Sequence, residues 1–499
     1  MSDPVVTYAQ GTARGIWRDT GPGGPYDRSA AFLGLPFAEP PVGPHRFGAP
    51  VPSGPWDGVR EATTYGATAQ RRSFGEVTAI PEPSIPGDAT LNVNVFTPVP
   101  GQPDALLPVF VWIHGGGYKA GSPASPWYDG RAFNRDGVVT VTLSYRLGFD
   151  GFGWIPDAPH NRGLLDQIEA LRWVQRHIAA FGGDPERVTI GGQSAGGGSV
   201  WALLVSPVAR GLLSAAISHS GALEVQPSET AEAHGRELAQ LAGVPWTREG
   251  LTALTEDQIL DLQDQVGVPA PPTDLAGAVD GILDGGGVSL AYLPYVDREV
   301  LDLSVAEALA SGVAADVPVI TGATAHEFTG VGPLLAPLLA TGDLTEVLRA
   351  SRLGPIADQV LAAYGDLPAG PAAVLGQLMT EMTFRVPMVI WADLRGPAPT
   401  WLYDFRLRHS ETGLAAHCAE LPFAWDLLDA PQVAASCDPD PPQDLADLMH
   451  RGWVAFIHDH RAPWSAWEPD RLAAVFDREP SVGPAFAVES EIAAALRRP

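Results

Sequence analysis

The 499-residue sequence is poor in cysteine and contains no long apolar run. Its two cysteines, Cys418 and Cys437, are too few for the disulfide framework on which small secreted proteins depend. No apolar stretch approaches the ~20 residues that a membrane-spanning helix needs. The first six residues lack the basic and apolar segments of a signal peptide. We therefore expect a cytoplasmic protein without a membrane anchor.

Basic residues are also scarce. The chain has 31 Lys and Arg against 58 Asp and Glu, which gives a formal net charge of −27. Such an excess of negative charge repels phosphate backbones and anionic lipid headgroups. We therefore expect no nucleic acid and no membrane as partners, and the charge most simply keeps the protein in solution. The expected partner is a small-molecule substrate, bound by a monomer or a homodimer.

No linker divides the chain. The 55 glycines and 48 prolines are spread along it, and there is no internal repeat or low-complexity tract. Length alone would allow about three domains, but large α/β folds often form one unit. A chain of this size can bury roughly three quarters of its unfolded surface. We therefore predict one domain over residues 1–499.

Apolar patterns predict an α/β fold with a large, mostly parallel sheet. Residues 107–113 and 138–145 are nearly continuous apolar runs, which is typical of strands buried on both faces. Residues 91–96 alternate in polarity and predict a half-exposed strand. Helical spacing over residues 164–181, ended by glycines, predicts a crossover helix. Residues 5–66 predict short N-terminal antiparallel strands.

The most informative motif is G-x-S-x-G at residues 192–196, directly after a β-branched strand pattern. Between a strand and a helix, this motif forms a nucleophile elbow, a sharp turn that exposes the serine hydroxyl. Glycines on both sides of Ser194 remove the Cβ atoms that would clash in such a turn. A chain with 55 glycines could contain this pentapeptide by chance. The motif therefore needs support from the rest of the sequence.

A serine hydroxyl needs a base to accept its proton and an acid to orient that base. In hydrolases with this elbow, the chain order is serine, acid, histidine. Glu327 follows a predicted strand near residues 317–321, and His417 lies in a loop after another at 400–405. Spacing alone leaves competitors: Asp280, Asp297 and Asp302 for the acid, and His326, His409, His450, His458 and His460 for the base.

The third requirement is a pair of backbone amides that stabilise a developing oxyanion. Residues 114–117 read His-Gly-Gly-Gly at the end of a predicted strand, as in the glycine-rich oxyanion loop of esterases. We expect Gly116, Gly117 and Ala195 to supply the amides. A plain flexible turn is the alternative interpretation of this loop.

Together these motifs resemble the type-B carboxylesterase/lipase family, the cholinesterase-like group of α/β-hydrolases, and most of all its bacterial para-nitrobenzyl-esterase branch. The resemblance extends over nearly the whole chain. It is carried by residues 32–43, Arg46 and Phe47, and by residues 91–95, 112–117, 145–148, 161–174, 181–185 and 417–423.

The resemblance implies an α/β-hydrolase fold with N-terminal antiparallel strands. It also implies a loop at about 67–90 over the active-site gorge and helical cap insertions at about 225–312 and 335–394. It assigns Ser194 as nucleophile, Glu327 as acid and His417 as base, with Ser220 supporting the acid. It implies neither a cofactor nor a metal.

Two positions depart from the family pattern. The residue before the nucleophile is usually glutamate and here is Gln193. Ala69 and Thr90 stand where the family has the cysteines of a loop disulfide, so the 67–90 loop has no covalent link.

The expected activity is hydrolysis of short- to medium-chain carboxylic esters through an acyl-enzyme. The same groups could act on carbamates, amides, or aromatic and synthetic polyesters. A remote alternative is a non-catalytic adhesion relative, although those usually lose catalytic residues. A metal hydrolase is disfavoured because the sequence has no H-E-x-x-H motif.

The substrate pocket is expected near Tyr118, Gln193, Phe328 and Phe423. Because the base must be uncharged, activity should fall below about pH 6.5, the ordinary pKa of histidine.

Overall fold

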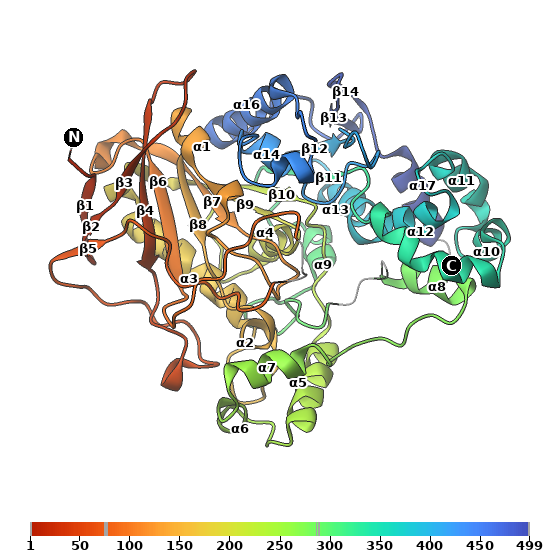
Figure 1. Cartoon of the computed structure of the whole chain (residues 1–499), viewed down its shortest axis with the longest axis horizontal. Helices are drawn as coiled ribbons and strands as arrows, with labels where there is room; N and C mark the ends of the chain where they lie inside the picture. Colours follow the sequence, from red (N-terminus) through yellow and green to blue (C-terminus); the bar gives the residue numbers. More distant parts are fainter. Residues whose placement is uncertain (1, 74–77, 286, 288–289, 498–499) are drawn as a thin grey trace.

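The computed structural model describes residues 2–73, 78–285, 287 and 290–497. Its centre is an eleven-stranded sheet (Figure 1). In spatial order the strands are β14 (Ser481–Pro484), β13 (Leu472–Phe476), β12 (Thr400–Phe405), β11 (Val319–Thr324), β10 (Ala215–His219), β9 (Gly183–Gln193), β7 (Leu107–Ile113), β8 (Val139–Leu143), β6 (Asn92–Thr97), β4 (Arg28–Pro36) and β3 (Ile16–Asp19).

The middle of this sheet is parallel from β8 to β13, as predicted. Antiparallel pairs occur at both edges, through β6, β4 and β3 on one side and β14 on the other. Because the carboxyl ends of parallel strands meet at one edge, loops after β7, β9 and β11 lie close together. That edge is where the predicted site residues follow their strands.

Strand β7 shows why the central strands are apolar throughout. Val109, Val111 and Ile113 belong to one buried cluster, whereas Phe110 and Trp112 belong to another on the opposite face. The first cluster is covered by α3 (Arg162–His177), α4 (Ala195–Val205), α9 (Val305–Ala310) and α13 (Val386–Arg395). The second is covered by α1 (Arg131–Arg135), α14 (Leu421–Ala424) and α16 (Gln443–Asp459).

The prediction of a half-exposed strand at residues 91–96 is wrong. Every residue of β6 is buried. The strand lies inside the sheet between β4 and β8, and its polar side chains have buried partners. Asn92 donates to the carbonyls of Ala67 and Ala89, and Asn94 donates to Thr142. Polar residues alternate with apolar ones in β6 because its asparagines form hydrogen bonds to neighbouring segments, not because they face solvent.

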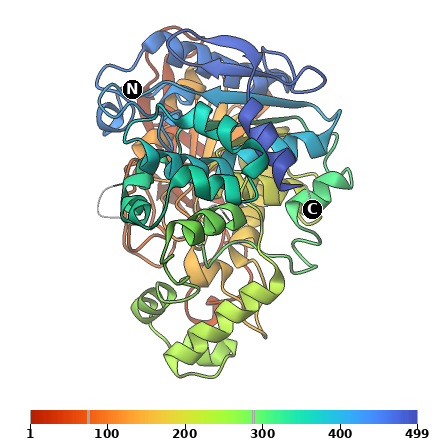
Figure 2. The same ribbon diagram turned by 90° about the vertical axis from the view of Figure 1, so that its right-hand side faces the viewer.

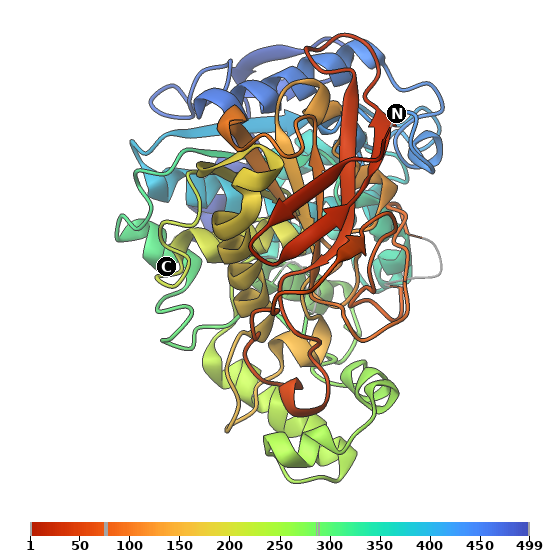
Figure 3. The same ribbon diagram turned by 90° about the vertical axis from the view of Figure 1, so that its left-hand side faces the viewer.

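The N-terminal strands are only partly as predicted. β1 (Val5–Tyr8) and β2 (Gly11–Arg14) are antiparallel, but β2 pairs in parallel with β5 (Val59–Glu61) in a small separate sheet. Figure 3, in which the left-hand side of Figure 1 faces the viewer, shows the N-terminal strands in red at the front. The strands β3 and β4 join the large sheet instead.

The predicted insertions contain helices joined by irregular segments; residues 74–77 of the loop and 286, 288 and 289 lie outside the described residues. One lobe contains α5 (Ser228–Ala242), α6 (Arg248–Thr252) and α7 (Glu256–Gln263), close to α2 (Gly148–Phe152) (Figure 1). A second lobe has its own apolar cluster and faces the viewer in Figure 2. It comprises α8 (Leu275–Gly285), η5 (Thr329–Thr341), α10 (Leu344–Ala350), α11 (Ala357–Tyr364), α12 (Pro371–Thr380) and α17 (Ala487–Leu496).

Among the described residues, no single helix is long and apolar enough to cross a membrane, and one bent pair, Thr329–Thr341 with Leu344–Ala350, passes by length and composition only.

Candidate active site

Ser194 occupies the sharp turn between β9 and α4. Its backbone has φ 55° and ψ −124°, a conformation that a residue with a side chain rarely adopts. Two hydrogen bonds fix the turn. The Ser194 amide donates to His219 O at 2.9 Å, and the Gly198 amide donates to Ser194 O at 2.8 Å. The surrounding sheet and helix therefore hold the serine in a strained conformation that exposes its side chain.

Gly196 permits α4 to approach β7 at the turn. A Cβ atom on Gly196 would lie 2.0 Å from Ile113 O, a backbone atom of the central sheet. We expect Gly196→Ala to lower kcat/KM for an ester by about 100-fold, because displacing a reacting group by about 1 Å has that effect. The matched control is Gly281→Ala on α8, where nothing lies within 4 Å. An unchanged rate in Gly196→Ala would contradict the close approach.

Glu327 and His417 form a hydrogen-bonded pair beside this turn. Glu327 Oε1 accepts from Ser220 Oγ at 2.6 Å and from the Thr324 amide at 2.7 Å. Glu327 Oε2 contacts His417 Nδ1. The Glu327 side chain is fully buried, whereas His417 remains partly exposed. The buried carboxylate therefore fixes the tautomer in which Nδ1 carries the proton and Nε2 is free to accept one.

Gln193 is hydrogen-bonded to Nε2 of His417, the ring nitrogen that Glu327 does not contact. Its side-chain Nε2 lies 3.0 Å from His417 Nε2, so the amide donates to the ring. Within the described part of the chain, no hydrogen bond joins Ser194 Oγ to His417. In this arrangement the Gln193 amide has to release the ring before the Ser194 hydroxyl can transfer its proton. A glutamate, the residue usual in the family, could not donate such a bond when ionised.

The glycine loop after β7 contributes backbone amides. Gly116 and Gly117 have φ of 109° and 60°, and a Cβ atom on Gly116 would lie 2.2 Å from Ala120 O. A hydrogen bond also holds the start of the loop, because Tyr145 Oη donates to His114 O at 2.9 Å. No acceptor among the described residues takes the amides of Gly116 and Gly117. The loop is therefore a fixed turn with two unused donors.

These groups share one cavity of about 310 Å³. Gly116, Gly117, Gln193, Ser194, Phe328 and His417 all line it, so the structure brings together most of the residues singled out from the sequence. Ala195 is the next residue after Ser194 in the chain and the first residue of α4. Further lining residues were not predicted: Thr78, Ala79, Ile80, Glu82, Leu223, Leu290, Thr383, Phe384 and Cys418.

Two expected pocket residues lie elsewhere. Tyr118 is buried against Phe152, with ring centroids 4.9 Å apart, and Phe423 packs on Phe405 at 5.3 Å. Neither side chain lines the cavity. Nearness in sequence to Gly117 and His417 was the only reason to expect them there, and both point into the core instead.

Phe384 could not be expected from the sequence. It lies in the π-helical turn η7 (Glu381–Arg385), and its ring lies 5.0 Å from that of His417. Phe328 contacts the same imidazole at 5.3 Å. Together the two rings shield one side of the histidine from water. A π-helical turn is often found at functional sites, but no local sequence signal announces it.

A second buried carboxyl lies beneath the Glu327–His417 pair. Burial and the nearby Glu327 carboxylate raise the pKa of Glu420 above its usual value, which favours its protonated form. His219 Nδ1 lies 3.4 Å from Glu420 Oε1, and burial lowers the pKa of His219 to about 3. Both groups are therefore uncharged near neutrality, and the charge in this region is concentrated on Glu327.

The competing acids and bases have other surroundings. Among the bases, His326 Nδ1 accepts from the Ala415 amide, and His450 lies against Asp136. Among the acids, Asp297 accepts from Asn161. None of these three residues lines the cavity. The same holds for the five remaining competitors, Asp280, Asp302, His409, His458 and His460. No group of three or more possible metal ligands occurs in the part of the chain that the structure describes.

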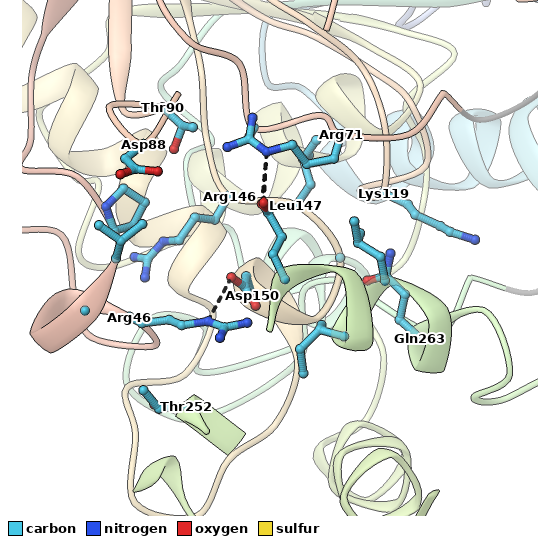
Figure 4. Close-up of a pocket in the computed structure, with 18 residues that line it drawn as sticks. Arg46, Arg71, Asp88, Thr90, Lys119, Arg146, Leu147, Asp150, Thr252 and Gln263 are labelled. Atoms are coloured by element: carbon cyan, nitrogen blue, oxygen red, sulfur yellow. Dashed lines mark hydrogen bonds and ion pairs between the residues drawn. The ribbon is translucent and has the colours of Figure 1, made fainter. Parts of the chain in front are cut away.

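A second cavity, of about 350 Å³, lies between the 67–90 loop and α7 and does not include Ser194 (Figure 4). Its basic side chains pair with acidic ones nearby: Arg71 with Glu256 at 3.0 Å, Arg46 with Asp150 at 3.7 Å, Arg146 with Asp166 at 2.6 Å and Lys119 with Asp264 at 2.5 Å. Arg71 also donates to Gly87 O. The Arg71 pair, and those of Arg72 with Asp257 and Asp261, thus attach this loop to α7 in a chain without the disulfide.

Comparison with known proteins identifies the family. The carboxylesterase family model matches residues 2–469. The chain belongs to the carboxylesterase family. This carboxylesterase is 32% identical to the para-nitrobenzyl esterase of Bacillus subtilis (strain 168), over 90% of its own length and 91% of the relative's. It is 31% identical to the phenmedipham hydrolase of Pseudarthrobacter oxydans, over 89% and 90% of the two chains.

A solved structure supports the same assignment. The carboxylesterase EST55 of Geobacillus stearothermophilus superposes with a TM-score of 0.78 at 32% identity, covering 99% of this chain and 100% of the other. The predicted α/β-hydrolase fold is therefore confirmed. The protein is an enzyme that hydrolyses carboxylic esters, and its substrates are small-molecule esters.

Proposed function

We propose that this carboxylesterase cleaves short- to medium-chain esters through an acyl-enzyme formed on Ser194. One observation carries the proposal. Ser194, His417 and the amides of Gly116 and Gly117 open onto the same cavity of about 310 Å³, and Glu327 supports the histidine from behind. A nucleophile, a base and oxyanion donors are therefore available to one substrate carbonyl.

The proposed reaction has two steps. His417 Nε2 takes the proton of Ser194 Oγ while Oγ bonds to the ester carbonyl carbon. The oxyanion is held by the amides of Gly116, Gly117 and Ala195. The C–O bond of the ester then breaks, and the alcohol leaves with the proton from His417. Water repeats the sequence and releases the acid, while Glu327, held by Ser220, stabilises the imidazolium in each step.

We also propose a cytoplasmic bacterial enzyme built as one domain. Both cysteines, Cys418 and Cys437, are free and buried, which suits a reducing compartment. Two of the relatives described above are from bacteria. One sheet runs through the chain from β3 to β14, so the helical insertions share its core.

A substrate panel tests the proposal. We expect para-nitrophenyl esters of two to eight carbons to give the highest kcat/KM, with a fall at longer chains because the cavity is small. A para-nitrophenyl carbamate and a para-nitroanilide of the same acyl size should react more slowly. Release of nitrophenol or nitroaniline is followed by absorbance. An optimum above eight carbons would refute the chain-length proposal, and an anilide or carbamate that outperforms every ester would favour the alternative substrates.

A further inference from the structure

The active-site cavity contains a carboxyl group that the proposed mechanism does not use. Glu82, from the 67–90 loop, lines the cavity together with Ser194 and His417. Its Oε2 atom is buried and has no hydrogen-bond partner. No donor in the described part of the chain reaches either oxygen of this carboxyl.

Such a group is costly unless something pairs with it. Burying a carboxyl without a compensating hydrogen bond is unfavourable, and unpartnered buried polar atoms are rare in native proteins. Burial raises the pKa of Glu82 to about 7, with no basic side chain to lower it. The carboxyl therefore changes its charge near neutrality, inside the cavity that receives the substrate.

The position of Glu82 is fixed by its backbone. Gln70 Nε2 donates to Glu82 O at 2.8 Å, and Gln70 Oε1 accepts from the Gly121 amide at 2.6 Å. Gln70 is itself buried and thus links this part of the loop to the turn that follows the Gly116–Gly117 amides. The backbone that carries the Glu82 side chain is therefore held by a buried residue rather than by a free loop.

Glu82 lies close to Cys418, the residue that follows His417 in the chain. The departing alkoxide must receive its proton from His417, so the alcohol part of the ester lies next to that residue. Cys418 lines the same cavity, and it is close enough for the Glu82 charge to raise the pKa of its thiol further, beyond the effect of burial. This proximity to the His417–Cys418 segment favours a position of Glu82 beside the leaving alcohol.

We propose that Glu82 is a specificity residue that accepts a hydrogen bond from a primary ammonium group on the leaving alcohol of the ester. The ligand class is thus an amino-alcohol ester, with a hydroxyl in place of the ammonium group as the weaker form of the same donor. The inference rests on the proposed function, because it places the alcohol beside His417.

The proposal has a pH signature. Below about pH 7 the Glu82 carboxyl is protonated, and above it the carboxylate attracts an ammonium group more strongly. Burial raises the pKa of the other acids near it, Tyr128, Tyr145 and Cys418, well above their ordinary values, so these stay neutral. His417 also faces the cavity, but it acts on every ester alike, so its contribution cancels in a ratio of two substrates.

The test compares 4-(aminomethyl)benzyl acetate with its uncharged isostere 4-ethylbenzyl acetate, by chromatography of the released alcohol. In the wild type we expect the ratio of kcat/KM values, ammonium over ethyl, to reach about tenfold or more at pH 8, the usual size of a hydrogen bond to a charged group. The ratio should fall toward pH 6 with a midpoint near 7, because kcat/KM reports ionisation of the free enzyme.

Glu82→Gln should abolish the pH dependence of the ratio and lower the ratio about tenfold at pH 8. The control is Asp88→Asn, which changes a carboxyl of the same loop that lines the other cavity and should leave the ratio unchanged. A trimethylammonium analogue keeps the positive charge but cannot donate, so it should show a smaller preference than the primary ammonium ester.

The outcomes separate the two proposals. A ratio near one in the wild type, or one unaltered by Glu82→Gln while both esters are cleaved, overturns the Glu82 assignment alone. Equal preference for the trimethylammonium ester overturns the hydrogen bond. If neither ester is cleaved and the para-nitrophenyl esters also fail, the proposed function itself is wrong.

Discussion

Ser194→Ala is expected to lower kcat for para-nitrophenyl butyrate by about a millionfold, as loss of the nucleophile does in serine proteases. The substitution removes the one oxygen that the proposed mechanism bonds to the substrate. The elbow is fixed by backbone hydrogen bonds to His219 O and from the Gly198 amide, which alanine retains. The fold should therefore survive, and the residual rate should come from substrate binding and the oxyanion amides.

The measurement pairs kinetics with covalent labelling. An organophosphate should add one phosphoryl group to the wild type, mapped by mass spectrometry to the peptide that contains Ser194, and none to Ser194→Ala. The control is Ser481→Ala, which removes an exposed hydroxyl on β14 and should change neither result. If Ser194→Ala keeps wild-type rates, Ser194 is not the nucleophile.

Much of the fold could be predicted because its central strands are buried on both faces. Residues 107–113 are apolar throughout since successive side chains enter two different clusters, and that pattern is visible in the sequence. The sequence pattern locates the strand at 92–97, but the half-exposed state that it predicts is wrong. Asn92 and Asn94 resemble surface residues until their partners on distant segments are known.

The candidate site, like the fold, could be predicted from the sequence only in part. Ser194 and the Gly116–Gly117 loop are local motifs, so the chemistry could be predicted from short stretches. Glu327 and His417 could be selected from their competitors only through the family resemblance, because spacing left eight other residues. The contacts of Gln193 with His417, and of Glu82 with the cavity, depend on tertiary packing of a loop that has no periodic pattern.

Glu327→Gln is expected to lower kcat by about 10⁴-fold, as the equivalent change does in a serine protease. Glutamine has nearly the same shape, and its carbonyl oxygen can still accept from Ser220 Oγ and the Thr324 amide. Its NH₂ group then faces His417 Nδ1 and donates to it. The imidazole is thereby forced into the tautomer with the proton on Nε2, which cannot accept the proton of Ser194.

Single-turnover kinetics and thermal unfolding together test this explanation. Acylation and deacylation should both slow, because His417 acts as base in each, while the unfolding temperature should change little. Glu346→Gln, on the exposed surface of α10, is the matched control. A loss below about tenfold in a folded Glu327→Gln enzyme would show that the carboxylate does not set the tautomer. The buried and largely protonated Glu420 would then be the next acid to test, since its carboxyl also lies close to this pair.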